Sequence, residues 1–154
     1  MRKPGAKAIV CYQNKFLLVL RDNDPDIAYP NKWNLPGGGI NEGESPEAGM
    51  KRELEEEINL KQPNLVYTGT TTYDDGSLVY RYFCNLTDQQ FNEIKLLSEG
   101  QRLDWFTLDE ALGLIEKNGY SPYLSAYLQK FAKDIRVFLE GGNEVKPTDT
   151  ILSV

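Results

Sequence analysis

Two short apolar runs lie near the start of the chain, and three polar residues separate them. Residues 8–12 and 16–20 are apolar at both odd and even positions, whereas residues 13–15 are Gln, Asn and Lys. A strand that is apolar on both alternating faces is typical of a sheet covered on both sides. The pattern therefore predicts a β-hairpin within a sheet that carries a layer on each face.

Strand-like runs bounded by turn residues recur further along the chain. Residues 65–73 and 78–86 are strand candidates, and the sequence Asp-Asp-Gly-Ser between them predicts a connecting turn. A last short strand is expected at residues 103–106. The segment from residue 21 to residue 32 is polar and contains two prolines, so we expect a loop of a length that often carries function.

Helix signals mark three other segments. Ser45 is a candidate N-cap and Pro46 a candidate first residue of a helix that extends to about residue 58. Thr107 is the candidate cap of a helix that extends to about residue 117, and residues 122–139 form a further helix. Residues 141–154 mix Gly, Pro and polar residues, and we expect either a mobile tail or an interaction arm.

Composition and charge narrow the class of protein. The 154 residues, 40% of them hydrophobic, fit a single domain, which we place at residues 1–140. The net charge is −6, whereas proteins that hold nucleic acid through its phosphates need clustered Lys and Arg. We therefore expect no nucleic-acid partner. A small phosphorylated ligand held through metal ions is compatible with this charge.

The cysteine and histidine content limits the compartment and the chemistry. Cys11 and Cys84 lie in apolar, strand-like runs and are expected to be buried free thiols in a reducing cytoplasm. No apolar run approaches the roughly 20 residues needed to cross a bilayer, so we expect no membrane partner and a cytoplasmic monomer or homodimer. Because the chain has no histidine, a general base or metal ligand must be a carboxylate or another non-imidazole group.

Acidic residues gather on one side of the helix predicted at residues 47–58. Glu53, Glu56 and Glu57 are spaced i, i+3 and i+4, so they fan over about 100° of the helix surface. Glu57 also lies about 60° from the centre of the apolar stripe, where a carboxylate is costly unless it is paired or bound to metal. Oxygen ligands of this kind favour Mg²⁺ or Mn²⁺. The alternative is a solvated acidic face, the usual fate of such charge runs.

A specific motif occupies residues 38–60. Eight positions match the pattern G-x5-E-x7-R-E-U-x-E-E-x-G-U, in which U is a bulky aliphatic residue: Gly38, Glu44, Arg52, Glu53, Leu54, Glu56, Glu57 and Leu60. This segment resembles the box of the Nudix family. Asn59 stands where the family usually has glycine, and asparagine is the residue that, after glycine, best tolerates the left-handed conformation expected there.

The resemblance implies a fold and a reaction. The fold is α/β, the Nudix α/β/α sandwich with a mixed sheet between helices. The reaction is Mg²⁺-dependent hydrolysis, with Mn²⁺ as a substitute, of a pyrophosphate bond in a nucleoside diphosphate linked to another group X. Metal ligands by resemblance are Gly37, Glu53, Glu56, Glu57 and Glu99.

Several residues around the motif receive roles in the same way. Arg52 orients the site by binding either Glu56 or Glu44, and the general base is either Glu53 or Glu99. Glu93 is the fallback for Glu99, whose alternative role is that of an exposed loop acid.

Candidate substrate contacts come from glycines and arginines. Gly37 and Gly38 let the backbone approach a metal or a phosphate closely, and their alternative is an ordinary turn. Gly38 and Gly39 are the candidate substrate-binding glycines. Arg21 and Arg81 are candidate nucleotide contacts, as are Tyr29 and Tyr73.

The substrate stays open at this point. The segment from residue 21 to residue 33 resembles the MutT-related branch, which favours a nucleoside triphosphate cleaved to the monophosphate and pyrophosphate. Nucleoside-diphosphate sugars, ADP-ribose and dinucleoside polyphosphates are alternatives. A further alternative is a Nudix-fold module that binds a nucleotide without cleaving it, although such modules are expected to lose box carboxylates, and this chain retains all of them.

Overall fold

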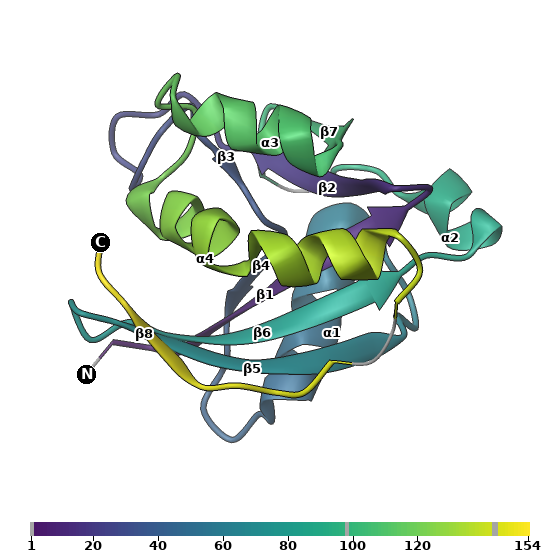
Figure 1. Cartoon of the computed structure of the whole chain (residues 1–154), viewed down its shortest axis with the longest axis horizontal. Helices are drawn as coiled ribbons and strands as arrows, with labels where there is room; N and C mark the ends of the chain where they lie inside the picture. Colours follow the sequence, from purple (N-terminus) through teal and green to yellow (C-terminus); the bar gives the residue numbers. More distant parts are fainter. Residues whose placement is uncertain (1, 98, 143–144) are drawn as a thin grey trace.

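A twisted mixed sheet divides the molecule into two layers of helices (Figure 1). The computed structural model describes residues 2–97, 99–142 and 145–154. In these residues the elements follow in the order β1 (Gly5–Tyr12), β2 (Lys15–Leu20), β3 (Trp33–Asn34), β4 (Gly37–Gly39), α1 (Pro46–Ile58), β5 (Leu65–Tyr73), β6 (Leu78–Asn85), α2 (Asp88–Glu93), β7 (Arg102–Phe106), α3 (Leu108–Ile115), α4 (Pro122–Leu139) and β8 (Thr150–Leu152).

The sheet mixes parallel and antiparallel pairs. Its strands follow the order β3-β2-β1-β6-β5-β8, with β4 paired to β1 and β7 paired to β2. The pairs β1–β6 and β5–β8 are parallel, and the others are antiparallel. One core cluster lies between the sheet and α3 and α4, and a second lies between the sheet and α1. The predicted α/β/α fold with a mixed sheet between helices is confirmed.

The predicted hairpin forms at β1 and β2. Tyr12 pairs with Lys15, and the two residues between them, Gln13 and Asn14, have φ of 48° and 66°. Two left-handed residues are the signature of a type I′ turn, whose twist matches that of the flanking strands. Alternate residues of β1 enter the two core clusters, so both faces are covered as the pattern predicts.

Helix α1 follows the sequence signals closely. The Ser45 side chain accepts a hydrogen bond from the Ala48 amide, and Pro46 opens the helix. The predicted apolar stripe is fully buried against the sheet; it consists of Met50, Leu54 and Ile58. Asn59 ends the helix at φ 59° and ψ 30°, the left-handed conformation expected of the residue in the glycine position.

Four elements were not anticipated from the sequence, and the first is the two-residue strand β3. The glycine segment expected to be a loop forms β4, and a capping box between Thr87 and Gln90 starts the short helix α2. The C-terminal segment, for which a mobile tail or an interaction arm was expected, instead places β8 on the edge of its own sheet. There Thr71 pairs with Thr150, and Thr70 binds the Asp149 carboxylate.

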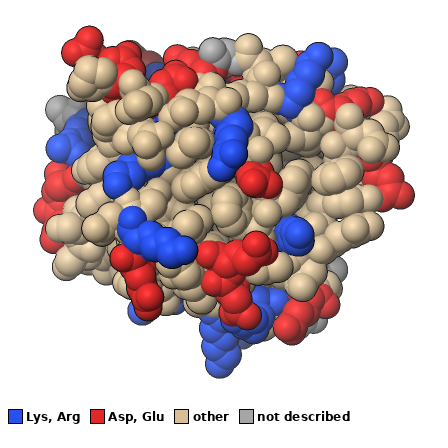
Figure 2. Space-filling view, turned by 90° about the horizontal axis from the view of Figure 1, so that it is seen from above, with Lys and Arg blue, Asp and Glu red and all other residues tan. Residues whose placement is uncertain are grey.

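The cysteines and the surface agree with the composition. Cys11 and Cys84 are buried free thiols, and burial raises the pKa of both, that of Cys84 to about 12. None of the helices in the described ranges combines the length and the apolar character needed to cross a bilayer. Figure 2 shows acidic and basic side chains interspersed over the face seen from above.

Candidate active site

The site starts where β1 changes its neighbour. Strand β1 pairs with β2 at residues 11–12 but with β4 at residues 5–7. The glycine strand β4 therefore takes the place beside β1 that β2 leaves. Gly37 has φ 137°, and a side chain there would collide with the Ala6 carbonyl. The tight fit requires glycine and fixes the position of the Gly37 backbone beside helix α1.

Glu57 reaches this backbone from α1. Its Oε1 accepts a hydrogen bond of 3.1 Å from the Gly37 amide. Burial raises the pKa of the Glu57 carboxyl, while Lys7 and the Gly37 amide act in the opposite direction. Glu57 is therefore a half-buried carboxylate between the helix and the glycine strand, as its place on the helical wheel predicts.

Glu53 packs against the next glycine of β4. A Cβ added to Gly38 would lie 2.5 Å from Glu53 Oε2, so the absence of a side chain leaves room for this carboxylate. The side chain of Glu53 is 21% exposed, which keeps its oxygens accessible from one side. Gly38 thus admits a carboxylate next to the backbone.

Arg52 ties the acidic residues together. Its Nε and Nη2 donate to the two oxygens of Glu44 at 2.8 and 2.9 Å, a bidentate pair. Its Nη1 donates to Glu53 at 2.9 Å and to Glu56 at 3.2 Å, and Nη2 also donates to the Gly39 carbonyl at 2.8 Å. Both partners offered as alternatives from the sequence, Glu44 and Glu56, are therefore contacted. The Arg52 guanidinium and the Asn41 amide lower the pKa of Glu44 to about 2.

An acidic cleft of about 240 Å³ opens beside Glu57. Its other lining carboxylates are Asp22, Asp24 and Glu99, and Arg21 lies on its wall. The fallback residue Glu93 is on α2 and is exposed outside this cleft. Within the described ranges, no three Asp, Glu or Cys side chains already stand close enough together to enclose a metal ion.

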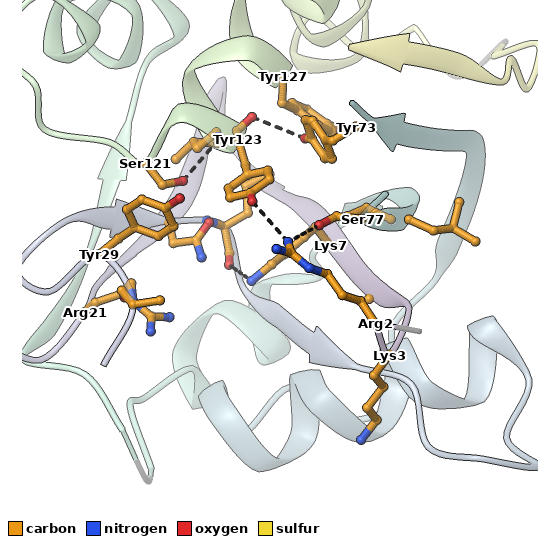
Figure 3. A pocket seen from close by; sticks show the side chains of 17 residues that line it. Arg2, Lys3, Lys7, Arg21, Tyr29, Tyr73, Ser77, Ser121, Tyr123 and Tyr127 are labelled. Atoms are coloured by element: carbon orange, nitrogen blue, oxygen red, sulfur yellow. Dashed lines mark hydrogen bonds between the residues drawn. The ribbon is translucent and has the colours of Figure 1, made fainter. Parts of the chain in front are cut away.

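A second cavity of about 360 Å³ adjoins the cleft, and we refer to it as the tyrosine pocket (Figure 3). Four tyrosines and four basic residues contribute to its lining: Tyr29, Tyr73, Tyr123, Tyr127, Arg2, Lys3, Lys7 and Arg21. The ring of Tyr123 meets those of Tyr73 and Tyr29 edge-on, with centroids 4.9 and 5.9 Å apart. The buried Tyr127 hydroxyl has no hydrogen-bond partner in the described residues. Arg21 lines both cavities, so they share a wall.

Comparison with protein families identifies the origin of this arrangement. Residues 1–127 match the model of the NUDIX domain. The chain belongs to the Nudix family. Gly38, Glu44, Arg52, Glu53, Glu56 and Glu57 are thus the residues of its Nudix box.

Relatives of known name and similar solved structures support this membership. An RNA pyrophosphohydrolase from Tolumonas auensis is 33% identical over 106 residues, which cover 69% of this chain and 55% of the relative. Diphosphoinositol polyphosphate phosphohydrolase 3-alpha of Mus musculus is 26% identical over 66% of this chain and 62% of its own length. The matched segments thus span less than two thirds of these relatives.

Two crystal structures show the same fold. A NUDIX hydrolase from Nitrosomonas europaea has a TM-score of 0.69 at 19% identity, covering 100% of this chain and 81% of its own. A MutT protein from Methanosarcina mazei has a TM-score of 0.65 at 24% identity, covering 87% and 97%.

The structure places the predicted Nudix site residues in two groups. The box carboxylates, Arg52 and the three glycines meet around β4, and Glu99 and Arg21 line the adjoining cleft. Arg81 is the exception. It is 2% exposed, its Nη2 donates to the Thr148 carbonyl at 2.6 Å, and its guanidinium lies 4.0 Å from the centre of the Phe131 ring.

The assignment of Arg81 as a substrate contact is therefore replaced by a role in the core. Strand alternation turns its side chain toward α4, together with its neighbour Phe83. There the guanidinium binds the C-terminal segment, and burial lowers its pKa. The sequence alone does not distinguish a buried arginine in a strand from an exposed arginine that contacts a ligand.

Sequence reasoning missed three charged residues that line the two cavities. Asp22 and Asp24 were included only as part of a polar loop, and they line the acidic cleft. Lys7 was not considered, although it is the one charged residue in the strand-like run of residues 5–12. A lone charge in an otherwise buried strand was the signal that would have identified it.

Proposed function

We propose that the chain is a Mg²⁺-dependent pyrophosphohydrolase that converts a nucleoside triphosphate and water to the nucleoside monophosphate and pyrophosphate. The observation that carries this proposal is the wall shared by the acidic cleft and the tyrosine pocket at Arg21. One cavity offers oxygen ligands for a metal-bound phosphate chain, and the other offers aromatic rings for a nucleoside. A single substrate that spans both cavities must carry both groups.

The carboxylates of the box, together with Glu99 in the cleft, fit a hard divalent cation. The oxygen donors are Glu53, Glu56, Glu57, Glu99 and the Gly37 carbonyl, with no histidine in the chain. The raised pKa of buried Glu57 reflects a carboxylate that a cation would stabilise, and the missing side chain of Gly38 leaves space beside Glu53. A bound divalent cation supplies charge neutralisation on the phosphates and a lower pKa for water.

The side chains of this chain perform the remaining work. Either Glu53 or Glu99 accepts the proton from the attacking water: Arg52 fixes one oxygen of Glu53 at 2.9 Å, and Glu99 lies in the cleft. Arg52 also holds Glu44 and the Gly39 carbonyl, so the loop and the helix keep their spacing. Arg21, on the shared wall, is positioned to contact the phosphate chain.

The tyrosine pocket favours one nucleoside over larger groups. Its volume of about 360 Å³ lies near the lower end of the range of about 300–1,000 Å³ that is typical of small-molecule sites. The tyrosines would supply stacking and edge contacts to a base, and their hydroxyls would supply hydrogen bonds. The net charge of −6 argues against an extended RNA substrate.

A substrate panel with Mg²⁺ tests the proposal. The panel contains the nucleoside triphosphates, a nucleoside-diphosphate sugar, ADP-ribose, a dinucleoside polyphosphate, 5′-triphosphorylated RNA and an inositol pyrophosphate. We expect a nucleoside triphosphate to give the highest kcat/KM, with pyrophosphate as the released product. A higher value on any other compound would overturn the substrate assignment, and tight nucleotide binding without turnover would favour a binding module.

Metal removal provides a second test of the same proposal. We expect negligible activity in EDTA and recovery with Mg²⁺ or Mn²⁺, because adjacent carboxylates and a polyphosphate repel one another without a divalent cation. Zn²⁺ should be a poor replacement, since the chain lacks the histidine and paired cysteine ligands that zinc prefers. Full turnover in chelator would contradict the mechanism.

A further inference from the structure

Lys7 is a half-buried lysine in the wall of the tyrosine pocket. It lies on β1, opposite Gly37 of β4, and its neighbours Ala6 and Ala8 face α1. Alternation along the strand therefore turns the Lys7 side chain to the other face, where it lines the tyrosine pocket (Figure 3).

The ammonium group of Lys7 has only backbone acceptors within hydrogen-bond reach in the described residues. Its Nζ lies 3.2 Å from the Leu35 carbonyl and 3.5 Å from the Gly37 carbonyl. An ammonium carries three N–H donors, so at least one of them is left for a ligand in the pocket. Burial lowers the pKa of Lys7, and the charge of Arg21 acts in the same direction, whereas Glu57 and Glu53 act in the opposite direction.

Two of the three other cations of the pocket are already engaged by side chains, and the third, Arg21, donates its Nε to the Ala28 carbonyl. Arg2 forms an ion pair with Asp75 at 2.9 Å and donates to Ser77, and Lys3 donates to Asn41 at 2.7 Å. Lys7 differs from both because it combines a free donor with a place beside Gly37, between the tyrosines and the box carboxylates. An anionic group of a ligand that enters the pocket would meet this ammonium.

We infer that Lys7 binds the phosphoryl group attached to the nucleoside, the phosphate that stays on the monophosphate product. This inference rests on the proposed function and adds a residue to it. A nucleoside in the tyrosine pocket that directs its 5′-phosphate toward the cleft places this phosphate beside Lys7, whose unused N–H lies on the pocket side. The contact anchors the substrate at the point where its nucleoside ends and its phosphate chain begins, so it contributes to positioning as well as to affinity.

Binding measurements without metal isolate this contact. The probes are adenosine, guanosine, cytidine and uridine, each compared with its 5′-monophosphate by isothermal titration calorimetry in EDTA. We expect the wild-type protein to bind at least one monophosphate about 10-fold or more tightly than the matching nucleoside, the scale of a charge-assisted hydrogen bond. Lys7→Met keeps the length of the side chain and should remove most of this preference, with the nucleoside affinity unchanged within about twofold.

Two further variants separate a local contact from general charge. Lys7→Arg keeps a cation at the site and should retain part of the preference. Lys15→Met removes one positive charge from an exposed position on β2 and should retain all of it. If Lys7 served only to hold β4 through the two carbonyls, Lys7→Met would weaken nucleoside and monophosphate binding equally.

The outcomes distinguish this inference from the proposed function. A wild-type protein without preference for a monophosphate overturns the role of Lys7, as do equal losses in Lys7→Met and Lys15→Met. If Lys7→Met does not fold, reductive methylation of the wild-type protein replaces it: a 5′-monophosphate, but not its nucleoside, should protect Lys7, as read by mass spectrometry. Absence of hydrolysis on the nucleoside triphosphates, with a Lys7-dependent preference intact, would remove the proposed reaction and leave the binding role.

Discussion

At the scale of single residues, the glutamates of α1 occupy different surroundings despite their close spacing. Glu57 is half-buried against Gly37, Glu53 fits beside Gly38, and the side chain of Glu56 is 60% exposed and contacts Arg52. Glu55 is also exposed, on the other side of Leu54 in the helical wheel. Exposure alone therefore does not separate a candidate ligand from a solvated charge; direction around the helix does.

Glu55 and Glu56 form a matched pair for mutation. Glu56→Gln should lower kcat/KM by at least ~10²-fold, about 2.7 kcal/mol of transition-state stabilisation, because a metal-binding charge is lost. Glu55→Gln should stay within about threefold of wild type, as expected of a solvated charge. Assays at saturating and limiting Mg²⁺ would show the Glu56→Gln defect as a changed metal dependence. Equal losses in both variants would mean that the function of these carboxylates does not depend on the side of α1 that carries Glu53, Glu56 and Glu57.

Glu99 and Glu93 form a second pair. Glu99 lines the acidic cleft with Glu57, whereas Glu93 is exposed on α2. If Glu99 is a ligand or the base, Glu99→Gln should lower kcat by about 10²-fold with little change in Tm, the usual scale for a positioned acid–base group. Glu93→Gln should leave kcat unchanged. A Glu99→Gln variant within about threefold of wild type would make Glu99 an ordinary loop acid.

At the scale of elements, Arg52 joins α1 to the segment that leads into it. The bidentate pair with Glu44 and the bond to the Gly39 carbonyl hold helix, loop and glycine strand in one unit. Asn59 completes the helix at its other end, where its side chain donates to the Glu93 carbonyl. The Nudix box is thus a structural unit as well as a set of candidate ligands.

The Arg52–Glu44 pair predicts a specific pH dependence of stability. The folded-state pKa of Glu44 is lowered to about 2, against about 4.3 in an unfolded chain, so the pair stabilises the fold above about pH 4.3 and this contribution is lost as the pH falls toward 2. Glu44→Gln should be less stable than wild type at pH 7, and the difference should shrink below about pH 4. Urea midpoints at pH 7, 5, 4 and 3 would measure this; a difference that is constant with pH would contradict it.

At the scale of the whole molecule, the C-terminal segment closes the sheet edge and supports the pocket. Arg81 binds the Thr148 carbonyl from inside the core, and Gly69 has no side chain because that carbonyl passes directly over it. Strand β8 then pairs with β5, whose last residue, Tyr73, lines the tyrosine pocket. Residues far from the Nudix box in sequence therefore support the wall of the tyrosine pocket.

Removal of residues 145–154 tests this support. The truncated chain should lose at least about 2 kcal/mol of unfolding free energy, because the buried Arg81 guanidinium would lose its shortest hydrogen bond and keep only those of 3.4 Å to Thr68 and Thr70. Its kcat/KM should also fall, because Tyr73 in the wall of the tyrosine pocket would lose the support of β8. Ile151→Ser is the control: Ile151 is 81% exposed, and its change should stay within about 0.5 kcal/mol. Urea denaturation that gives equal midpoints for the truncated and complete chains would rule out the supporting role.

The sequence by itself determined the local elements and the chemistry of the box. The hairpin turn at Gln13 and Asn14, the cap at Ser45 and the left-handed Asn59 depend on a few adjacent residues. The types of these residues indicate the turn and the helix ends directly. Family resemblance then gave the order of layers. The identity and spacing of the box glutamates also limited the candidate metals.

The tertiary structure alone decided which distant residues meet. Three contacts join segments about 30 to 80 positions apart: Lys7 with Gly37, the buried Arg81 with Thr148, and Thr71 with Thr150 in the pairing of β5 with β8. Strand alternation predicts on which face of the sheet a side chain lies, but not which element covers that face. For this reason the sequence suggested Arg81 as a ligand contact and did not draw attention to Lys7. Such contacts depend on how the layers pack, and no local pattern encodes that packing.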